Sequence, residues 1–180
     1  MPCTLNHGRL EACKEQIGGL KSIFFIDYDE TFTLSQGGDD EITGMAFTNA
    51  TNLYKYELKG TNSFEQTLTS SRENGTTFAE QTLTFTIKGQ DAQTLKEIKL
   101  LCSGRPRVIV ETNQHQYFLA GNEHGMDVTT SLITNGTAMG DLNGFTTTLV
   151  GQESTYALIF DAQTETALIG LMTNETIVTN

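Results

Sequence analysis

The feature that most constrains the fold is the stretch of residues 61–88, TNSFEQTLTSSRENGTTFAEQTLTFTIK, in which Asn74-Gly75 separates two runs rich in Thr, Phe and Leu. Asn-Gly is the strongest short-range signal for a two-residue type I′ turn, because both central residues must tolerate positive φ. The sequence therefore predicts a long β-hairpin in which Glu73 pairs with Thr76. Each arm would extend roughly 33 Å at ~3.3 Å per residue, which is longer than most strands.

The expected register separates the side chains of this hairpin into two chemically different faces. It places Phe64 opposite Phe85 and Thr69 opposite Glu80, and side chains alternate between the two faces along each strand. Phe78 is the main exception, because it falls on the polar face near the turn. The apolar face carries Phe64, Gln66, Leu68, Leu83, Phe85 and Ile87, and the polar face carries Glu65, Thr67, Thr69, Glu80, Thr82, Thr84 and Thr86.

A two-stranded ribbon of this length is marginally stable alone, so it must pack its apolar face on its own domain. Its edges also offer unpaired backbone groups to other chains. We interpret the hairpin as an assembly element that joins a sheet shared between subunits. The alternative is an ordinary hairpin inside a monomeric sandwich.

Composition limits the partners of the chain. Its 180 residues are enough for one domain with its own core, so residues 1–180 are expected to form a single domain. The formal net charge is −11, and a chain this acidic is a poor direct binder of nucleic acid, since phosphate binding depends on Lys and Arg. The same charge is compatible with a protein that surrounds or guides DNA without holding it.

The N-terminal lead-in, residues 1–22, lacks the apolar segment of a signal peptide. No stretch of the chain approaches the ~18 apolar residues of a membrane span. We therefore expect synthesis in the cytoplasm, reduced thiols and no membrane contact. The odd number of cysteines argues against a disulfide framework and leaves the role of Cys3, Cys13 and Cys102 open.

The remaining pattern is rich in strands and predicts one helix. Asp91 is a suitable N-cap, apolar residues then recur every three or four positions, and Gly104 ends the segment, so residues 91–103 are expected to form a helix with Leu95, Ile98, Leu101 and Cys102 on its packed face. The fold class predicted is mainly β, an antiparallel β-sandwich or barrel with one packed helix and a long hairpin. The other expected strands are Ser22–Tyr28, Thr31–Ser35, Glu41–Phe47, Leu53–Lys59, Arg107–Glu111, Gln116–Ala120, Met126–Ile133, Phe145–Val150 and Thr155–Phe160.

The C-terminal extension, residues 163–180, has strand character at Ala167–Met172 and at Ile177–Val178. A segment that pairs with a neighbouring subunit would have this pattern. A routine last strand of the same sheet would have it as well.

Metal-binding residue types occur near the N-terminus as Cys3-x3-His7-x5-Cys13. Tetrahedral zinc sites need four ligands, commonly in two closely spaced pairs, and the fourth ligand here could only be remote. The sequence therefore predicts no metal, no cofactor and no catalytic residues, since nucleophile and base motifs are also missing. The remote candidates for a fourth ligand are Cys102, His115 and His124.

A glycine-rich stretch and the content of aromatic residues also bear on function. Gly136–Gly144 is rich in glycine but lacks the Lys-[ST] of a phosphate-binding loop. Glycan binding is the main alternative from another functional class, because the chain is rich in strands and aromatic residues. The chain has no Trp, and most Phe residues are predicted to face inward, so glycan binding is the weaker hypothesis.

Several segments resemble virion structural proteins of tailed phages that infect Bacteroidetes-type bacteria, and the similarity covers most of residues 10–160. They are YKYELKGTNSFEQTLTSSRENGTTFAEQTLTFTIKG, DAQTLKEIKLLCSG, RPRVIVE, YFLAGNEHGMDVTTS, GDLNGFTTTLVGQES and ALIF. The order of elements resembles that of phage tail-tube proteins, in which a sandwich carries one long hairpin and one helix on a sheet.

This resemblance implies a non-enzymatic subunit, without cofactor or catalytic residues, that forms homo-oligomeric rings, commonly hexamers, stacked into a tube. The long hairpin of such proteins contributes to a continuous inner β-barrel with an acidic lumen. Carried onto this chain, the residues facing the lumen would be Glu65, Thr67, Thr69, Glu80, Thr82, Thr84 and Thr86, and those at the contact between rings would be Arg72, Glu73, Asn74 and Gly75, with Arg72 beside an acidic partner.

The function expected is therefore a tail-tube or DNA-conduit subunit of the virion, made in the cytoplasm of the host bacterium. Its partners would be copies of itself and other tail or neck proteins, and genomic DNA would pass without specific binding. Within the virion, the alternatives are a neck or portal-proximal ring and a capsid auxiliary protein. A glycan-binding sandwich is the alternative outside it.

Overall fold

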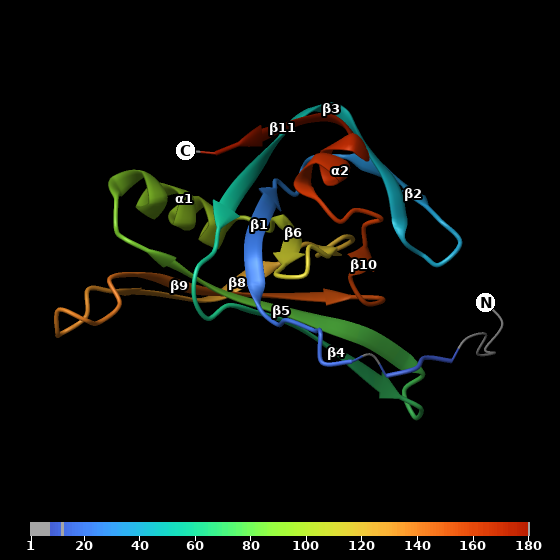
Figure 1. Cartoon of the computed structure of the whole chain (residues 1–180), viewed down its shortest axis with the longest axis horizontal. Helices are drawn as coiled ribbons and strands as arrows, with labels where there is room; N and C mark the ends of the chain where they lie inside the picture. The colour runs from blue at the N-terminus through green and yellow to red at the C-terminus, as the bar shows by residue number, and fades with distance from the viewer. Residues whose placement is uncertain (1–7, 12, 180) are drawn as a thin grey trace.

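The computed structural model describes residues 8–11 and 13–179 and has a mainly β fold, with 51% of residues in strands and 11% in helices. A seven-stranded sheet has the order β10-β7-β6-β1-β3-β11, with β2 also paired to β3, and a four-stranded sheet has the order β4-β5-β9-β8 (Figure 1). All strand pairs among the described residues are antiparallel except β11 with β3. The predicted antiparallel β-sandwich or barrel is confirmed.

The seven-stranded sheet combines strands from both ends of the chain with β6 and β7 from its middle, and the four-stranded sheet takes two strands from before β6 and two from after β7. The first sheet contains β1 (Leu20–Ile26), β2 (Phe32–Gln36), β3 (Ile42–Glu57), β6 (Arg107–Thr112), β7 (Tyr117–Ala120), β10 (Leu158–Ile159) and β11 (Met172–Val178). The second contains β4 (Ser63–Ser71), β5 (Thr76–Lys88), β8 (Asp127–Thr134) and β9 (Gly144–Glu153).

Both faces of the seven-stranded sheet are covered in its central strands. In β1, Ile23 and Phe25 face the four-stranded sheet, while Phe24 and Ile26 face the opposite side. This explains the unbroken apolar run of residues 23–26, because a strand covered on both faces does not alternate apolar with polar residues. The core between the two sheets contains Leu83, Phe85 and Leu149 from the four-stranded sheet, with Val108, Val110 and Met126.

The opposite side of the seven-stranded sheet is closed by its own curvature and by the C-terminal segment. The helix α2 (Glu165–Gly170) lies under the arch of β3 and β11 (Figure 1) and buries Leu168 in that core. A strand was predicted at Ala167–Met172, and that prediction is wrong. Thr164 caps the helix by accepting a hydrogen bond from Ala167 N at 3.1 Å, and β11 starts only at Met172.

The C-terminal strand β11 pairs with β3 of its own chain, so the described part of the C-terminal extension is a routine last strand. The two strands predicted at Glu41–Phe47 and Leu53–Lys59 are a single strand, β3, of sixteen residues. Its first part pairs with β2 and its last part with β1, and β11 lies on its other edge.

The helix α1 (Ala92–Ser103) agrees with the prediction. Asp91 caps it by accepting a hydrogen bond from Thr94 N at 2.9 Å, and Gly104 N donates to the carbonyl of Leu100 at the other end. Its contact with the sheets is narrower than expected, since only Ile98 is fully buried and Cys102 is exposed. Neither helix in the described residues has the length and apolar character needed to cross a membrane.

The long hairpin is formed by β4 and β5, but its turn differs from the prediction. Ser71 pairs with Thr76, so residues 72–75 form a four-residue loop in place of the expected two-residue turn. The register is shifted by two residues, and Thr67 rather than Thr69 lies opposite Glu80. A shift of two leaves every side chain on the face predicted for it, because the side-chain period of a strand is two.

The strand β9 also continues further than predicted. One strand was predicted to end at Val150 and the next to begin at Thr155, but residues 151–153 belong to β9 and pair with β5. The next strand, β10, has only two residues and pairs with β7 in the other sheet. Gly151 allows β9 to pack closely against the backbone at Gly125, because a Cβ at position 151 would lie 3.0 Å from the carbonyl oxygen of Gly125.

Candidate functional site

The outer face of the four-stranded sheet, here called the polar face, carries most of the residues predicted to have a function. Cross-strand rows such as Glu65–Thr82–Val150–Asp127 and Thr67–Glu80–Gln152 put these side chains on one surface. Glu65, Thr67 and Thr69 are exposed, while Glu80, Thr82, Thr84 and Thr86 on the neighbouring strand are half-buried. That this surface faces a lumen stays a prediction.

Hydroxyl groups are paired across the strands of the polar face. Thr84 and Thr148 lie with their Oγ1 atoms 3.2 Å apart, and Thr86 and Thr146 repeat this contact at 3.2 Å. Within the four strands, the polar face carries no Lys or Arg before Lys88, the last residue of β5. Apart from Lys88 at its end, the polar face therefore presents hydroxyls and carboxylates, without a cluster of cations that could hold a phosphate.

The covered face of the hairpin is less apolar near its tip than predicted. Gln66 Oε1 accepts a hydrogen bond from Ala157 N at 2.7 Å, and Gln81 Oε1 accepts one from Gly121 N at 2.9 Å. Both glutamines thus join β4 and β5 to loops of the rest of the domain. They hold the hairpin with its polar side turned outward.

Both edges of the four-stranded sheet lack a neighbouring strand in the part of the chain that the structure describes. The edge strands are β4 and β8, and each step across the sheet from β4 to β8 is antiparallel. Three such steps make β4 and β8 antiparallel to each other. Exposed edges of this kind can add a strand from another chain.

The hairpin projects beyond the rest of its sheet. Pairing between β5 and β9 ends at Ala79 with Glu153, so residues 69–78, here called the hairpin tip, are a two-stranded ribbon with a loop. Gly75 occupies the left-handed region with φ of 63°, and the loop contains the exposed residues Arg72, Glu73 and Asn74. Just before the tip, Leu68 is 43% exposed.

A cleft of about 610 Å³ lies between α1, the end of β1, the end of β3 and the end of β5. Three tyrosines, Tyr28, Tyr54 and Tyr56, line it, and the exposed Leu100 of α1 stands at its side. It is here called the acidic cleft, because four carboxylates share it. They are Asp27, Asp29, Glu30 and Glu97.

The carboxylates of the acidic cleft affect one another. Burial, and then the negative charges of Glu30, Asp29 and Glu97, raise the pKa of Asp27 above its ordinary value. Burial, and then the charge of Glu97, also raise the pKa of Tyr56. The four carboxylates and the three tyrosine rings thus line the same cleft.

Arg107 fixes the turn that carries these carboxylates. Its Nη1 donates hydrogen bonds to the carbonyl of Tyr28 at 3.0 Å and to that of Glu30 at 2.8 Å, and its guanidinium lies 4.7 Å from the centroid of the Tyr28 ring. The donors of Arg107 are thus engaged by backbone oxygens. It positions residues 27–30 and does not pair with their side chains.

A second concentration of polar groups is buried at the far end of β1 and β6. The Glu111 carboxylate accepts hydrogen bonds from Lys21 Nζ at 2.7 Å, from Ser22 Oγ and from His115 Nδ1 at 3.2 Å. Burial opposes ionisation of Glu111, but these hydrogen bonds outweigh it and lower its pKa. Because Ser22 bonds to the carboxylate and not to His115, the group is a structural network and not a nucleophile with its base.

The network includes an unsatisfied hydroxyl. Tyr117 Oη is the one buried side-chain polar atom of the described residues without a hydrogen-bond partner of acceptable geometry. Burial, and then the nearby charge of Glu111, raise the pKa of Tyr117. The hydroxyl therefore stays protonated beside the carboxylate.

A third group, which sequence spacing could not reveal, joins Glu123, His124 and Glu153. Their ligand atoms lie within 4.8 Å of one another, as a metal site would require. However, Glu153 accepts hydrogen bonds from Glu123 N at 3.1 Å and from His124 N at 2.8 Å. These backbone donors account for the buried carboxylate of Glu153 without an ion.

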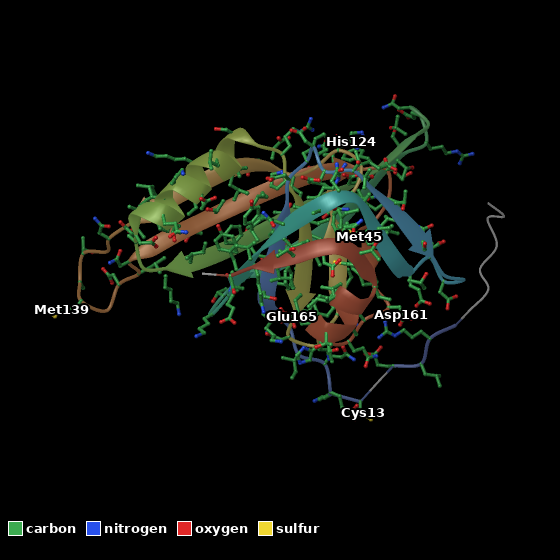
Figure 2. All side chains as sticks on the ribbon, turned by 90° about the horizontal axis from the view of Figure 1, so that it is seen from above. Cys13, Met45, His124, Met139, Asp161 and Glu165 are labelled. Carbon is green, nitrogen blue, oxygen red and sulfur yellow. The ribbon has the colours of Figure 1, made fainter. Side chains whose placement is uncertain are left out.

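The described residues among those considered for an N-terminal metal site are not brought together. Cys13 and Cys102 are exposed and free, His115 contacts Glu111, and His124 contacts Glu153. Cys3 and His7 lie outside the described residues. Figure 2 shows Cys13 on the N-terminal segment, away from the body of the domain.

The chain matches no protein-family model, no curated protein and no solved structure. The polar face, its two open edges, the hairpin tip and the acidic cleft are the structural features that bear on function.

Proposed function

We propose that the protein is a structural subunit of a phage virion that forms a ring or tube through which DNA passes, as tail-tube proteins do. The observation that carries this proposal is the combination of a polar face whose one Lys or Arg on the described strands is Lys88, at the end of β5, and two open edges on the same sheet. Unpaired edges of this kind favour aggregation in a monomer, whereas an oligomer can pair them. The subunit would be made in the host cytoplasm and would act in the virion.

The direction of the edge strands supports closure into a ring. In a cyclic oligomer every copy has the same orientation along the axis, so β4 of one copy meets β8 of the next. These strands are antiparallel within one copy, and their pairing between copies would continue the antiparallel order of the sheet. A hexamer would contribute about 24 strands, with a circumference of at least about 115 Å at ~4.8 Å per strand.

The chemistry of the polar face supports a channel that DNA crosses without stopping. Glu65 and Glu80 repel phosphate, and the threonines offer neutral hydroxyls. Lys and Arg, which give nucleic-acid binding most of its affinity, do not occur on the strands of this face before Lys88. A neck or portal-proximal ring would use the same geometry without stacking into a tube.

Glycan binding has one structural feature in its favour, the acidic cleft. Tyrosine rings can stack on sugars, and carboxylates can accept hydrogen bonds from their hydroxyls. Binding of host-surface polysaccharide to a protein that stays monomeric would support this second candidate.

The test is the oligomeric state combined with hydrogen exchange. We expect the purified protein to form rings with a central hole in negative-stain images, and light scattering to give an integral number of subunits. Amides on the outer edges of β4 and β8 should exchange rapidly in the dissociated subunit and become protected in the ring, while β5 amides stay protected in both. A monomer at all concentrations, or rings whose β4 and β8 amides remain unprotected, would refute the edge-paired conduit.

A further inference from the structure

We propose that the acidic cleft of one subunit receives Arg72 from the hairpin tip of a second copy, in a head-to-tail contact between successive rings. This inference rests on the proposed function and specifies the acidic partner that Arg72 meets. It assigns the acidic cleft a ligand, which is a guanidinium group presented on a projecting β-ribbon.

The four carboxylates of the acidic cleft are not paired with a cation, although Arg105 lines the cleft. Among the described residues, Asp27, Asp29, Glu30 and Glu97 form no ion pair. Within the part of the chain that the structure describes, the carboxylate of Glu30 accepts a hydrogen bond only from the hydroxyl of Thr51, at 2.9 Å. Burial and the three neighbouring carboxylates raise the pKa of Asp27, which is the effect expected where like charges are crowded. A cation entering the cleft would relieve this repulsion.

The cations nearest to the acidic cleft are already engaged. Arg105 lies at its rim and pairs with Asp127 at 3.3 Å, while Arg107 is held by backbone carbonyls. The three tyrosines make the cleft suitable for a flat cation, because a guanidinium stacks on aromatic rings and forms two parallel hydrogen bonds to a carboxylate. A lysine ammonium would fit this combination less well.

Arg72 has the properties that the cleft requires. It is exposed in the loop of the hairpin tip and has no ion-pair partner among the described residues. The tip extends beyond β9 by the last residues of β4 and the first of β5, so Arg72 stands clear of its own sheet. Glu73, the next residue, could approach Arg105 at the rim. The exposed Leu68 and Leu100 provide apolar surface on the two sides of such a contact.

The positions of the two surfaces suit head-to-tail association. Both views place α1, which forms one wall of the acidic cleft, toward one end of the long axis and the turn between β4 and β5 toward the other (Figures 1 and 2). Contact between two different surfaces of identical subunits repeats without limit unless it closes. Such a contact stacks rings, whereas the edges of β4 and β8 act within a ring.

Charge reversal provides the test in the full-length protein. Arg72→Glu and Glu97→Lys should each leave rings intact and reduce the association of rings into stacks by about tenfold or more, and the double variant should restore it. The controls are Lys99→Glu, an exposed cation on α1, and Asp39→Lys, an exposed carboxylate in the loop between β2 and β3. Stack length is measured by negative stain and by sedimentation, and thermal midpoints verify that each variant folds.

The outcomes separate this inference from the proposed function. Loss of stacking in both single variants and recovery in the double variant would support the contact. Rings that stack equally well in every variant would overturn it and leave the ring proposal standing. Loss of stacking in the control variants, equal to that in Arg72→Glu and Glu97→Lys, would overturn it as a specific contact. Arg9 is another exposed arginine, in the N-terminal segment. Stacking lost with Arg9→Glu but not with Arg72→Glu would also overturn the contact. A protein that forms no rings and no stacks would overturn both proposals.

Discussion

Lys21 Nζ lies 2.7 Å from Glu111 Oε1, and this contact ties β1 to β6 at a carboxylate that is fully buried. The pKa of Glu111 is lower in the folded protein than its ordinary value of 4.5, because hydrogen bonds from Lys21, Ser22 and His115 outweigh the effect of burial. The ionised Glu111 carboxylate therefore contributes its full stabilisation above about pH 4.5, the ordinary pKa. This stabilisation is lost as the pH falls through the lower pKa of the folded state. We expect the free energy of unfolding to decrease below about pH 4.5.

The variant Glu111→Gln tests this assignment. It should cost about 2 kcal/mol at neutral pH and should flatten the acid limb of the stability profile. Glu57→Gln is the matched control, since Glu57 is exposed on the strand at the other side of β1. Denaturant unfolding between pH 3 and pH 7 is the measurement. An acid limb as steep in Glu111→Gln as in the wild type would show that other carboxylates dominate.

The loop of the long hairpin gives a second prediction. Gly75 has φ of 63°, and a Cβ built there meets no atom within 4 Å, so only the backbone conformation disfavours a side chain. Gly75→Val should cost about 1–2 kcal/mol, because a β-branched residue resists positive φ. Gly75→Asn should cost less. Gly140→Val, in equally open space but without positive φ, should be close to neutral in the same thermal-unfolding measurement.

A third prediction concerns the start of β9. A Cβ at Gly144 would lie 2.1 Å from the carbonyl oxygen of Ile87, inside the ladder between β5 and β9. Gly144→Ala should therefore destabilise the four-stranded sheet by about 3 kcal/mol or more, since neither backbone can move without breaking hydrogen bonds. Gly140→Ala, in the loop just before β9, is the control, because a Cβ there meets no atom within 4 Å. Equal thermal midpoints for the two variants would argue against the observed register.

The fourth prediction tests the polar face. Glu65→Lys combined with Glu80→Lys should leave assembly intact and impair genome delivery, because the wall would then attract phosphate. Assembled double variant should also bind DNA at least about tenfold more tightly than wild type, with strong salt dependence. Glu57→Lys with Asp39→Lys makes the same change of charge away from the polar face. Unchanged delivery by assembled virions of the double variant would contradict a DNA-lining role.

Much of the fold follows from local patterns. The faces of β4 and β5, the caps of α1 at Asp91 and Gly104, and the antiparallel sandwich are all predictable from periodicity and capping chemistry. The register of the hairpin is not, because Asn-Gly is compatible both with a two-residue turn and with the four-residue loop seen here. The period of two explains why the face assignment remains correct despite this error.

Other features depend on contacts that are distant in sequence. Ala167–Met172 has strand-forming residues, but burial of Leu168 under β3 and the cap at Thr164 favour the helix α2. The acidic cleft combines residues of β1, β3, β5 and α1, and no sequence spacing connects them. The cluster of Glu123 and His124 with Glu153 is of the same kind, since the loop and the strand meet only after both sheets have formed.

The parallel pairing of β11 with β3 has a consequence for biosynthesis. β3 is synthesised well before β11, yet β11 occupies one of its edges. Completion of the seven-stranded sheet must therefore wait for the synthesis of β11, and the strands made before it remain open to misassociation during translation. A nascent chain stalled just before Met172 should be sensitive to proteases and bound by chaperones. A chain in which all of β11, through Val178, has emerged from the ribosome should be resistant to proteases.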